Sequence, residues 1–205
     1  MLVTMPTPDN DAGAPMQPTD SPRVIAFFDV DNTLVHGASI YHLARVAWRR
    51  GYVKWRDLSR FAWQQARFKS VGENYRHQLS ARERALELVA GHTEQELQEL
   101  AVETYDAHLH ALMMPNVVAR AHDHIAQGHE VWLITATPEA CASVIALRLG
   151  LTGALGTRVE SIDGVFTGAL LGPVMHGGHK ADAAARLAGE KGIRLSDCWA
   201  YSDSR

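Results

Sequence analysis

The sequence predicts an α/β fold, in which an open parallel sheet is covered by helices and interrupted by a helical insertion. From residue 115 onward, short apolar segments typical of buried strands alternate with segments typical of helices, and this alternation indicates a parallel sheet. Residues 37–114 are instead rich in Ala, Leu, Gln, Glu and Arg, which favour helices. With 205 residues, 46% of them hydrophobic, the chain can form one sizeable core and a small inserted domain.

The first strand is predicted at residues 24–28, a continuous apolar run with β-branched and aromatic side chains. Such a run is typical of a strand that is buried on both faces. Residues 1–22 contain five prolines among polar residues, so we expect a flexible tail there, or a gene start placed too far upstream.

The insertion at residues 37–114 is expected to form a helical cap domain between two core segments, 23–36 and 115–205. Gly51, Gly72 and Gly91 divide it into three or four helices. The last of these opens with a capping box, in which Thr93 is followed by Glu96.

The remaining elements follow from their start and stop residues. We predict helices at 115–127, 139–149 and 180–191, and strands at 129–135, 156–162 and 198–201, with a hairpin turn at Asp163-Gly164. His122 and His124 are two apart on the first of these helices and point away from each other, so we interpret them as exposed residues rather than zinc ligands. Because ligands bind open parallel sheets at the carboxyl ends of the strands, a site is expected there.

Charge is unevenly distributed along the chain. Residues 37–90 contain eleven Lys and Arg but four Asp and Glu, although the whole chain carries a formal charge of −3. We interpret this segment as a solvated basic face over an aromatic core. The functional alternatives are attraction of an anionic substrate, a lipid phosphate among them, and contact with a lipid or membrane surface. Nucleic-acid binding is not expected without a recognisable motif.

Two further features bear on the compartment. No run of about 18 apolar residues occurs, so no transmembrane helix is expected. Cys141 and Cys198 lack metal-binding spacing, and we expect reduced thiols in a cytoplasmic protein.

The chemistry is concentrated where strands end. Asp29 and Asp31 follow the first strand two residues apart, so their side chains project the same way and repel unless a cation compensates. Mg²⁺ would resolve this repulsion and neutralise a phosphate, so that one carboxylate can attack and the other can transfer protons. On the pair alone, two solvated acids at a strand end would be the simpler interpretation.

Three later residues change that interpretation. Thr135 ends the second strand, where its hydroxyl could hold a phosphate oxygen. Lys180 follows a glycine-rich loop at a helix start, where its ammonium and nearby N–H groups could bind phosphate. Asp203 follows the last strand and could supply another oxygen to the metal.

This order of an acid pair, a hydroxyl, a lysine and an acid resembles the four motifs of the haloacid dehalogenase superfamily. The most specific match is DxDxT, seen as Asp29-Val30-Asp31-Asn32-Thr33. The helical insertion and the segments 163–168 and 176–180 look like the phosphoserine-phosphatase-like branch, subfamily IB. The resemblance implies a Rossmann-like core with an inserted helical cap.

The resemblance also implies residue roles. Asp29 would form an aspartyl-phosphate, and Asp31 would be the general acid and base. Thr135 and Lys180 would bind phosphoryl oxygens, and Mg²⁺ would be held by Asp29, Asp203 and the backbone carbonyl of Asp31. The expected activity is hydrolysis of a small phosphorylated metabolite, although transfer of the phosphoryl group to an alcohol would use the same intermediate.

The sequence departs from phosphoserine phosphatases at the substrate site. Those enzymes place a Glu nine positions after the nucleophile, where this chain has Ala38, and follow the second motif with Gly-Gly, where this chain has Ala136-Thr137. Arg84 lies near the position where their cap contributes an Arg to the substrate carboxylate. Phosphoserine is therefore an alternative substrate rather than the first expectation.

The chain ends two residues after Asp203, whereas the family's fourth motif continues to a second acid and a further strand. We therefore expect a core truncated at its C-terminus, with weakened Mg²⁺ binding and impaired activity. A non-catalytic remnant that binds phosphate compounds is the alternative from a different functional class.

Overall fold

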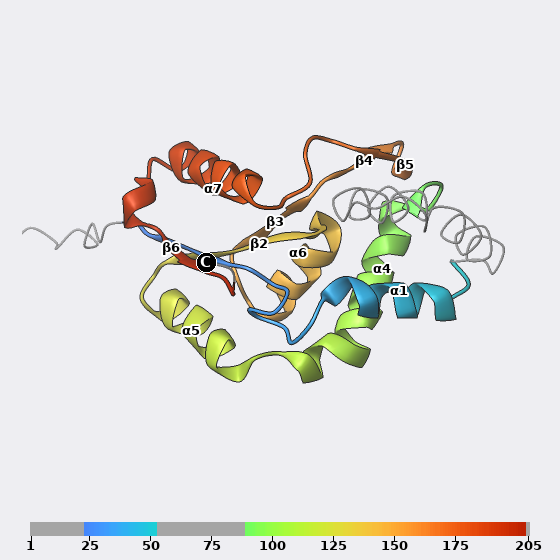
Figure 1. Ribbon diagram of the computed structural model, residues 1–205, viewed down its shortest axis with the longest axis horizontal. Coiled ribbons are helices and arrows are strands. Elements are labelled where there is room, and N and C mark those ends of the chain that lie inside the picture. Colours follow the sequence, from blue (N-terminus) through green and yellow to red (C-terminus); the bar gives the residue numbers. More distant parts are fainter. Residues whose placement is uncertain (1–22, 53–88, 204–205) are drawn as a thin grey trace, which may run out of the picture.

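The computed structural model describes residues 23–52 and 89–203. Its centre is a four-stranded sheet with the order β3-β2-β1-β6, in which every neighbouring pair is parallel. The strands are β1 (Ile25–Phe28), β2 (Glu130–Pro138), β3 (Gly153–Thr157) and β6 (Trp199–Tyr201). The predicted open parallel sheet is therefore confirmed (Figure 1).

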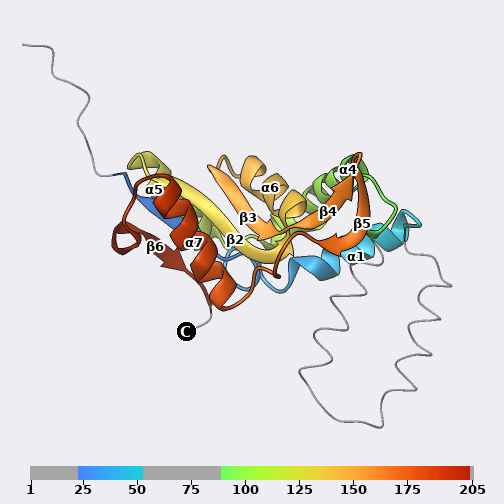
Figure 2. The same ribbon diagram turned by 90° about the horizontal axis from the view of Figure 1, so that it is seen from above.

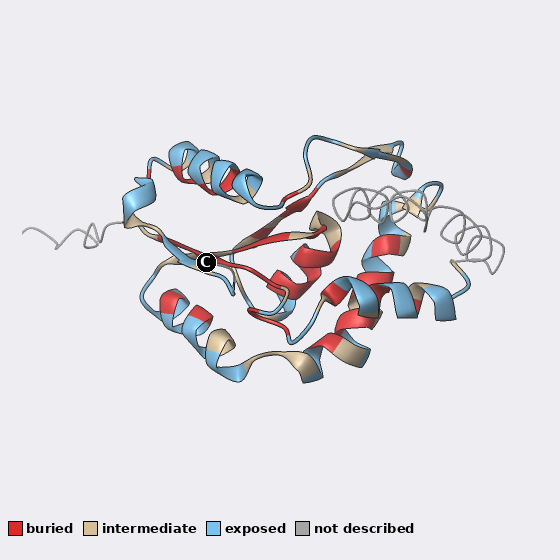
Figure 3. Cartoon of the chain, in the orientation of Figure 1, coloured by how far each residue is buried: buried red, intermediate tan, exposed pale blue. Residues whose placement is uncertain are grey.

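Helices cover both faces of this sheet. α5 (Pro115–Ala126) and α6 (Glu139–Arg148) lie on one face, and α7 (Gly178–Glu190) lies on the other (Figures 1 and 2). Side chains alternate along β1, so Phe28 packs with residues of α5 and α6, whereas Phe27 packs with residues of α7. Figure 3 shows the resulting buried strands between half-buried helices.

The described part of the insertion is helical, as expected. α1 (Ser39–Arg49) and α4 (Glu94–Thr104) are followed by a π-helical turn, η1 (Tyr105–Leu109), and a 3₁₀ turn, η2 (His110–Leu112). The capping box at the start of α4 is confirmed, because the Thr93 hydroxyl accepts from the Glu96 N–H and the Glu96 carboxylate accepts from the Thr93 N–H. Both helices add leucines to the core cluster that contains Phe28.

The third strand differs from the prediction. The predicted strand 156–162 is wrong in extent, because β3 ends at Thr157 and β4 (Val159–Ile162) belongs to a separate antiparallel hairpin with β5 (Val165–Leu170). β3 has the sequence Gly-Ala-Leu-Gly-Thr, which has weak strand propensity, so only its sheet neighbours define it. The predicted turn is confirmed, with positive φ at Asp163 and Gly164.

A short 3₁₀ turn, η3 (Leu195–Asp197), precedes β6. Among the described helices, none has the combined length and apolarity that crossing a membrane requires.

Candidate active site

Three of the predicted site residues lie at the same edge of the sheet because β1 lies between β2 and β6. Asp29 follows β1, Thr135 lies in the last part of β2, and Asp203 lies two residues beyond β6. The carboxyl ends of parallel strands meet at one edge of a sheet, which is where open α/β folds bind ligands.

Asp29 and Lys180 form an ion pair at this edge. The Lys180 Nζ lies 2.6 Å from the Asp29 Oδ2. Both side chains are largely shielded, with 22% and 12% of their respective side-chain surfaces exposed, so solvent screens the pair less than an exposed one. The other Asp29 oxygen, Oδ1, accepts a hydrogen bond of 2.7 Å from the Val30 N–H. The Asp29 N–H donates to the Tyr201 carbonyl at 2.9 Å, which joins the start of the site to β6.

A glycine turn positions Lys180. Gly177 precedes α7 with φ 57° and ψ −128°, a conformation that is costly for any residue with a Cβ. The Lys180 N–H donates to the Gly177 carbonyl at 3.0 Å. The chain thereby reverses into α7 and places Lys180 in its first turn, close to Asp29.

Asp31 is held by the beginning of α1. Its Oδ1 accepts a hydrogen bond of 2.8 Å from the Ser39 N–H. Asn32, the next residue in the loop from β1 to α1, has φ 58°. Its N–H donates to the Gly37 carbonyl, and its side-chain oxygen accepts from the Gly37 N–H. The loop from β1 to α1 is thus closed on itself, which limits the movement of Asp31.

Thr135 is almost completely buried, with 1% of its surface exposed. Its Oγ1 accepts a hydrogen bond of 3.2 Å from the Thr137 N–H. The Thr137 hydroxyl in turn shares a hydrogen bond of 2.9 Å with the Ser39 hydroxyl. Thr137, one of the two residues found where phosphoserine phosphatases have Gly-Gly, therefore connects the end of β2 to α1.

Asp203 is joined to the first motif through its backbone. Its N–H donates to the Thr33 Oγ1 at 2.9 Å, across 170 positions of sequence. Thr33 is buried, and its hydroxyl oxygen gives the Asp203 N–H an acceptor. The exposed Asp203 carboxylate makes no ion pair within residues 23–52 and 89–203.

A buried histidine, His124 of α5, also holds β6 in place through Tyr201. The prediction that His124 is exposed is therefore wrong. His124 is 5% exposed, and its ring nitrogens lie 2.8 Å from the His129 Nδ1 and 2.9 Å from the Tyr201 hydroxyl. Burial, and then the neighbouring His129, lower the pKa of His124 below its usual range. A neutral His124 therefore anchors Tyr201, whose ring stacks on Phe28 at 4.3 Å.

The donor set at this edge fits a hard divalent cation. Asp29, Asp31 and Asp203 bring three carboxyl groups, and Lys180 brings one ammonium, so acidic groups are in excess at this edge. All the expected ligand atoms are oxygens, as Mg²⁺ prefers. In the described ranges, no group of three or more His, Cys, Asp or Glu side chains lies close enough together to hold a metal. The ligand set implied by the resemblance is not a group of three such side chains, because it takes the backbone carbonyl of Asp31.

The structure connects residues that sequence analysis had not assigned to the site. Ser39, Thr33 and Thr137 link the acid pair to the ends of β2 and β6. Thr33 was visible as the last residue of the DxDxT motif, whereas the sequence signal for Ser39 and Thr137 was a hydroxyl side chain close to a motif residue. The predicted substrate residue Arg84 lies outside the described residues.

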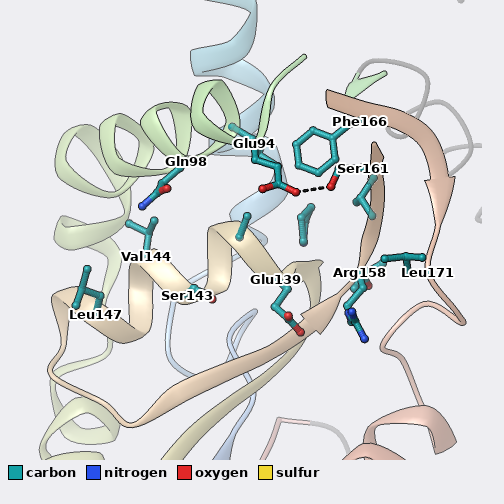
Figure 4. Close-up of a pocket in the computed structure, with 15 residues that line it drawn as sticks. Glu94, Gln98, Glu139, Ser143, Val144, Leu147, Arg158, Ser161, Phe166 and Leu171 are labelled. Atoms are coloured by element: carbon teal, nitrogen blue, oxygen red, sulfur yellow. Dashed lines mark hydrogen bonds between the residues drawn. The ribbon is translucent and has the colours of Figure 1, made fainter. Parts of the chain in front are cut away.

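A pocket of about 500 Å³ lies next to this site, between α4, α6 and the β4–β5 hairpin (Figure 4). Its lining includes Glu94, whose carboxylate accepts a hydrogen bond from Ser161, and apolar side chains such as Phe166. Thr157 connects the two regions, because it lines the pocket and its hydroxyl donates to the Ala136 carbonyl at 2.7 Å. None of Asp29, Asp31 or Lys180 lines this pocket, so it is a neighbour of the acid pair rather than its enclosure.

The geometry can be compared with known proteins. A curated relative, phosphoserine phosphatase SerB1 of Mycobacterium tuberculosis, is 44% identical over 203 residues, which are 98% of this chain and 66% of the relative. The chain thus spans just under two thirds of that protein's length. A crystal structure of a protein of unknown function from Bordetella pertussis Tohama I has a TM-score of 0.70 and 25% identity, over 87% of this chain and 79% of that one.

The fold is also shared with a phosphoserine phosphatase solved as a phospho-aspartyl intermediate analogue, at a TM-score of 0.54 and 20% identity, over 88% of this chain and 78% of that one. The family described as haloacid dehalogenase-like hydrolase matches residues 26–205. That match includes every residue of the site described above, and the resemblance noted in the sequence is confirmed. The chain belongs to the haloacid dehalogenase-like hydrolase family.

Proposed function

We propose that this chain is a Mg²⁺-dependent phosphatase that hydrolyses phosphomonoesters through an aspartyl-phosphate on Asp29. The observation that supports this most is the 2.6 Å contact between the Lys180 Nζ and the Asp29 Oδ2. An ammonium at this distance offsets the carboxylate's charge, so a phosphate dianion can approach an otherwise repulsive nucleophile.

In the first step, an Asp29 carboxylate oxygen attacks phosphorus and forms an acyl phosphate while the bond to the leaving oxygen breaks. Lys180 balances the charge on the phosphoryl oxygens, and the Thr135 hydroxyl donates to one of them. Asp31 gives its proton to the leaving alcohol, as a general acid. The Ser39 N–H donates a hydrogen bond to Asp31 Oδ1, so the other oxygen of Asp31, Oδ2, is the one available for this proton transfer.

In the second step, water attacks the phosphorus of the acyl phosphate, and Asp31 takes the water's proton. The products are inorganic phosphate and a regenerated Asp29 carboxylate, so the cycle balances. Mg²⁺, held by Asp29, Asp203 and the Asp31 carbonyl, would neutralise phosphoryl charge when bound. Thr33 supports this arrangement by fixing the Asp203 backbone.

We propose a small phosphorylated metabolite as the substrate. Phosphoserine is the second candidate, because a relative that is 44% identical is named a phosphoserine phosphatase. Ala38, at the N-cap of α1, argues against it, since an alanine offers no carboxylate to a substrate ammonium. The lipid phosphate suggested by the basic segment has no support in the described residues, because much of that segment lies within residues 53–88.

Free thiols support a reducing compartment such as the cytoplasm. Cys141 and Cys198 are both unpaired. Burial raises the pKa of the Cys141 thiol to about 12, so this cysteine is not a competing nucleophile.

The proposal can be tested by measuring phosphate release from an aryl phosphate with Mg²⁺ and with EDTA. We expect Mg²⁺-dependent turnover that Asp29→Asn abolishes. With a ³²P-labelled substrate, acid-quenched protein should carry a hydroxylamine-sensitive label that Asp29→Asn lacks. A phosphotransferase would instead move the label to an added alcohol in preference to water.

Asp123→Asn is the matched control, because Asp123 is an exposed acid on α5 that pairs with Arg120 on the same helix. It should retain wild-type turnover. Equal turnover by Asp29→Asn and the wild type would contradict the mechanism. A folded wild-type chain that binds phosphate without turnover would favour the non-catalytic alternative.

A further inference from the structure

Ser39 contacts two separate parts of the site at once. It is the first residue of α1 and is 3% exposed. Its N–H donates to the Asp31 Oδ1 at 2.8 Å, and its hydroxyl shares a hydrogen bond of 2.9 Å with the Thr137 hydroxyl. Thr137 lies near the end of β2, 98 positions away in sequence, so only the folded chain makes this contact.

The contact extends to Thr135. Thr137 is itself buried, and its N–H donates to the Thr135 Oγ1 at 3.2 Å. A continuous series of hydrogen bonds therefore runs from Asp31 through Ser39 and Thr137 to Thr135. It joins the residue assigned to proton transfer with the residue assigned to phosphate binding.

The start of α1 explains why Asp31 takes this bond. The N-cap residue Ala38 makes no side-chain capping bond, so the first N–H groups of the helix need another acceptor. The Asp31 carboxylate supplies it, and negative charge is favourable at a helix N-terminus. Movement of α1 would therefore move or release Asp31.

The other end of α1 is fixed to α4. Leu43 and Val46 are buried in the core cluster together with Leu97 of α4. Arg50, which follows α1, forms an ion pair with Glu103 of α4, with its Nε 2.5 Å from Oε2. The position of α1, and with it the position of Asp31, thus depends on the Ser39–Thr137 contact at one end and on packing against α4 at the other.

We propose that Ser39 is a positioning residue for the general acid Asp31. Its hydroxyl fixes the N-terminus of α1 to the end of β2, and its N–H then holds Asp31 in the orientation that delivers the proton. This inference rests on the proposed phosphatase function, which gives Asp31 its role. Ser39 itself contacts neither phosphate nor leaving group in this scheme.

The test exploits the leaving group. An aryl phosphate with an acidic phenol needs little protonation as its bond breaks, whereas an alkyl phosphate needs the general acid. In Ser39→Ala, kcat/KM should fall about tenfold for an alkyl phosphate, the scale of one lost hydrogen bond, and by less than about threefold for the aryl phosphate. A purely structural role would lower both values equally, because it would reduce the fraction of folded enzyme.

Thr137 supplies a second, independent variant. Thr137→Val keeps the shape but removes the hydroxyl, so it should reproduce the selective loss on the alkyl phosphate. Thr137→Ser keeps a hydroxyl and should recover the rate that Thr137→Val loses. In the double variant Ser39→Ala/Thr137→Val the loss should be no greater than in the worse single variant, because both remove the same contact.

Ser143→Ala is the matched control, since Ser143 is exposed on α6, and it should show the wild-type ratio of the two substrates. Equal losses on both substrates, or no loss on either, in both Ser39→Ala and Thr137→Val would overturn the role of Ser39 while leaving the proposed function intact. If Ser39→Ala fails to fold, Thr137→Val alone decides between these outcomes. Turnover that does not depend on Asp29 would overturn both proposals.

Discussion

Gly156 offers a sharp test of how closely β3 must approach the end of β2, the strand that carries Thr135. A Cβ added at Gly156 would lie 2.5 Å from the Glu139 Cα, 2.6 Å from the Glu139 nitrogen and 2.8 Å from the Thr137 carbonyl oxygen. All three atoms belong to the backbone, so no side-chain rotation can relieve the overlap. We therefore consider Gly156→Ala.

The size of the expected shift follows from these distances. Ordinary contacts of a Cβ begin at 3.4 Å, so the separation from the Glu139 Cα must grow by about 0.9 Å. Overpacking of this kind costs about 1–3 kcal/mol of stability. The atoms that must move belong to the end of β2 and the start of α6, which continue the chain from Thr135. Because a displacement near 1 Å can cost about 10²-fold in rate, we expect kcat/KM to fall by roughly that factor.

Two measurements separate the effects. Urea denaturation gives the loss of stability, and kcat/KM on an aryl phosphate, at a temperature where the variant is folded, gives the loss of positioning. Gly189→Ala is the control, because the same added Cβ meets nothing within 4 Å, and inside a helix alanine should stabilise by up to about 1 kcal/mol. A Gly156→Ala protein with unchanged stability and kcat/KM within about twofold of the wild type would refute the reasoning.

Three further predictions concern single contacts. Lys180→Gln removes the ammonium next to Asp29 and should lower kcat/KM by about 10²-fold or more; a loss below about threefold in steady-state kinetics would contradict the role of Lys180. Thr93→Ala removes the helix cap of α4 and should cost about 1 kcal/mol in urea denaturation, with Thr93→Ser as the control; equal losses in both variants would argue against the cap. Burial lowers the pKa of His124 in the folded protein, so as pH falls the unfolded chain binds a proton at this histidine before the folded chain does. The contribution of neutral His124 to stability is therefore complete above the unfolded pKa of about 6.5 and is lost as pH falls below it. Denaturation at pH 7.5 and 5.5 should therefore show a smaller pH-dependent loss in His124→Gln than in the wild type, and equal losses would refute this.

The sheet and the general position of the site could be predicted because their signals are local. The apolar run before Asp29 specifies a buried strand, and the positions of Thr135, Lys180 and Asp203 relative to strand and helix ends are visible in sequence. Parallel strands bring such ends to a common edge. The structure confirms the parallel sheet, and it brings Lys180 into contact with Asp29.

The third strand and His124 could not be predicted, for different reasons. β3 contains two glycines, and its course depends on the close approach of Gly156 to the next element rather than on propensity. His124 lies on a helix whose other histidine, His122, is exposed. Its burial depends on Tyr201, a residue of a strand 77 positions away.

The proposed reactive groups Asp29, Asp31 and Lys180 could be assigned from the sequence, because their motif and their places at element ends are local signals. The groups that hold them become visible only in the folded chain. The contacts of Ser39 with Thr137 and of Thr33 with Asp203 join residues 98 and 170 positions apart. Hydroxyls are common in loops, and a hydrogen bond depends on distance and direction in space, so only the packing of β1 between β2 and β6 makes these hydroxyls part of the site.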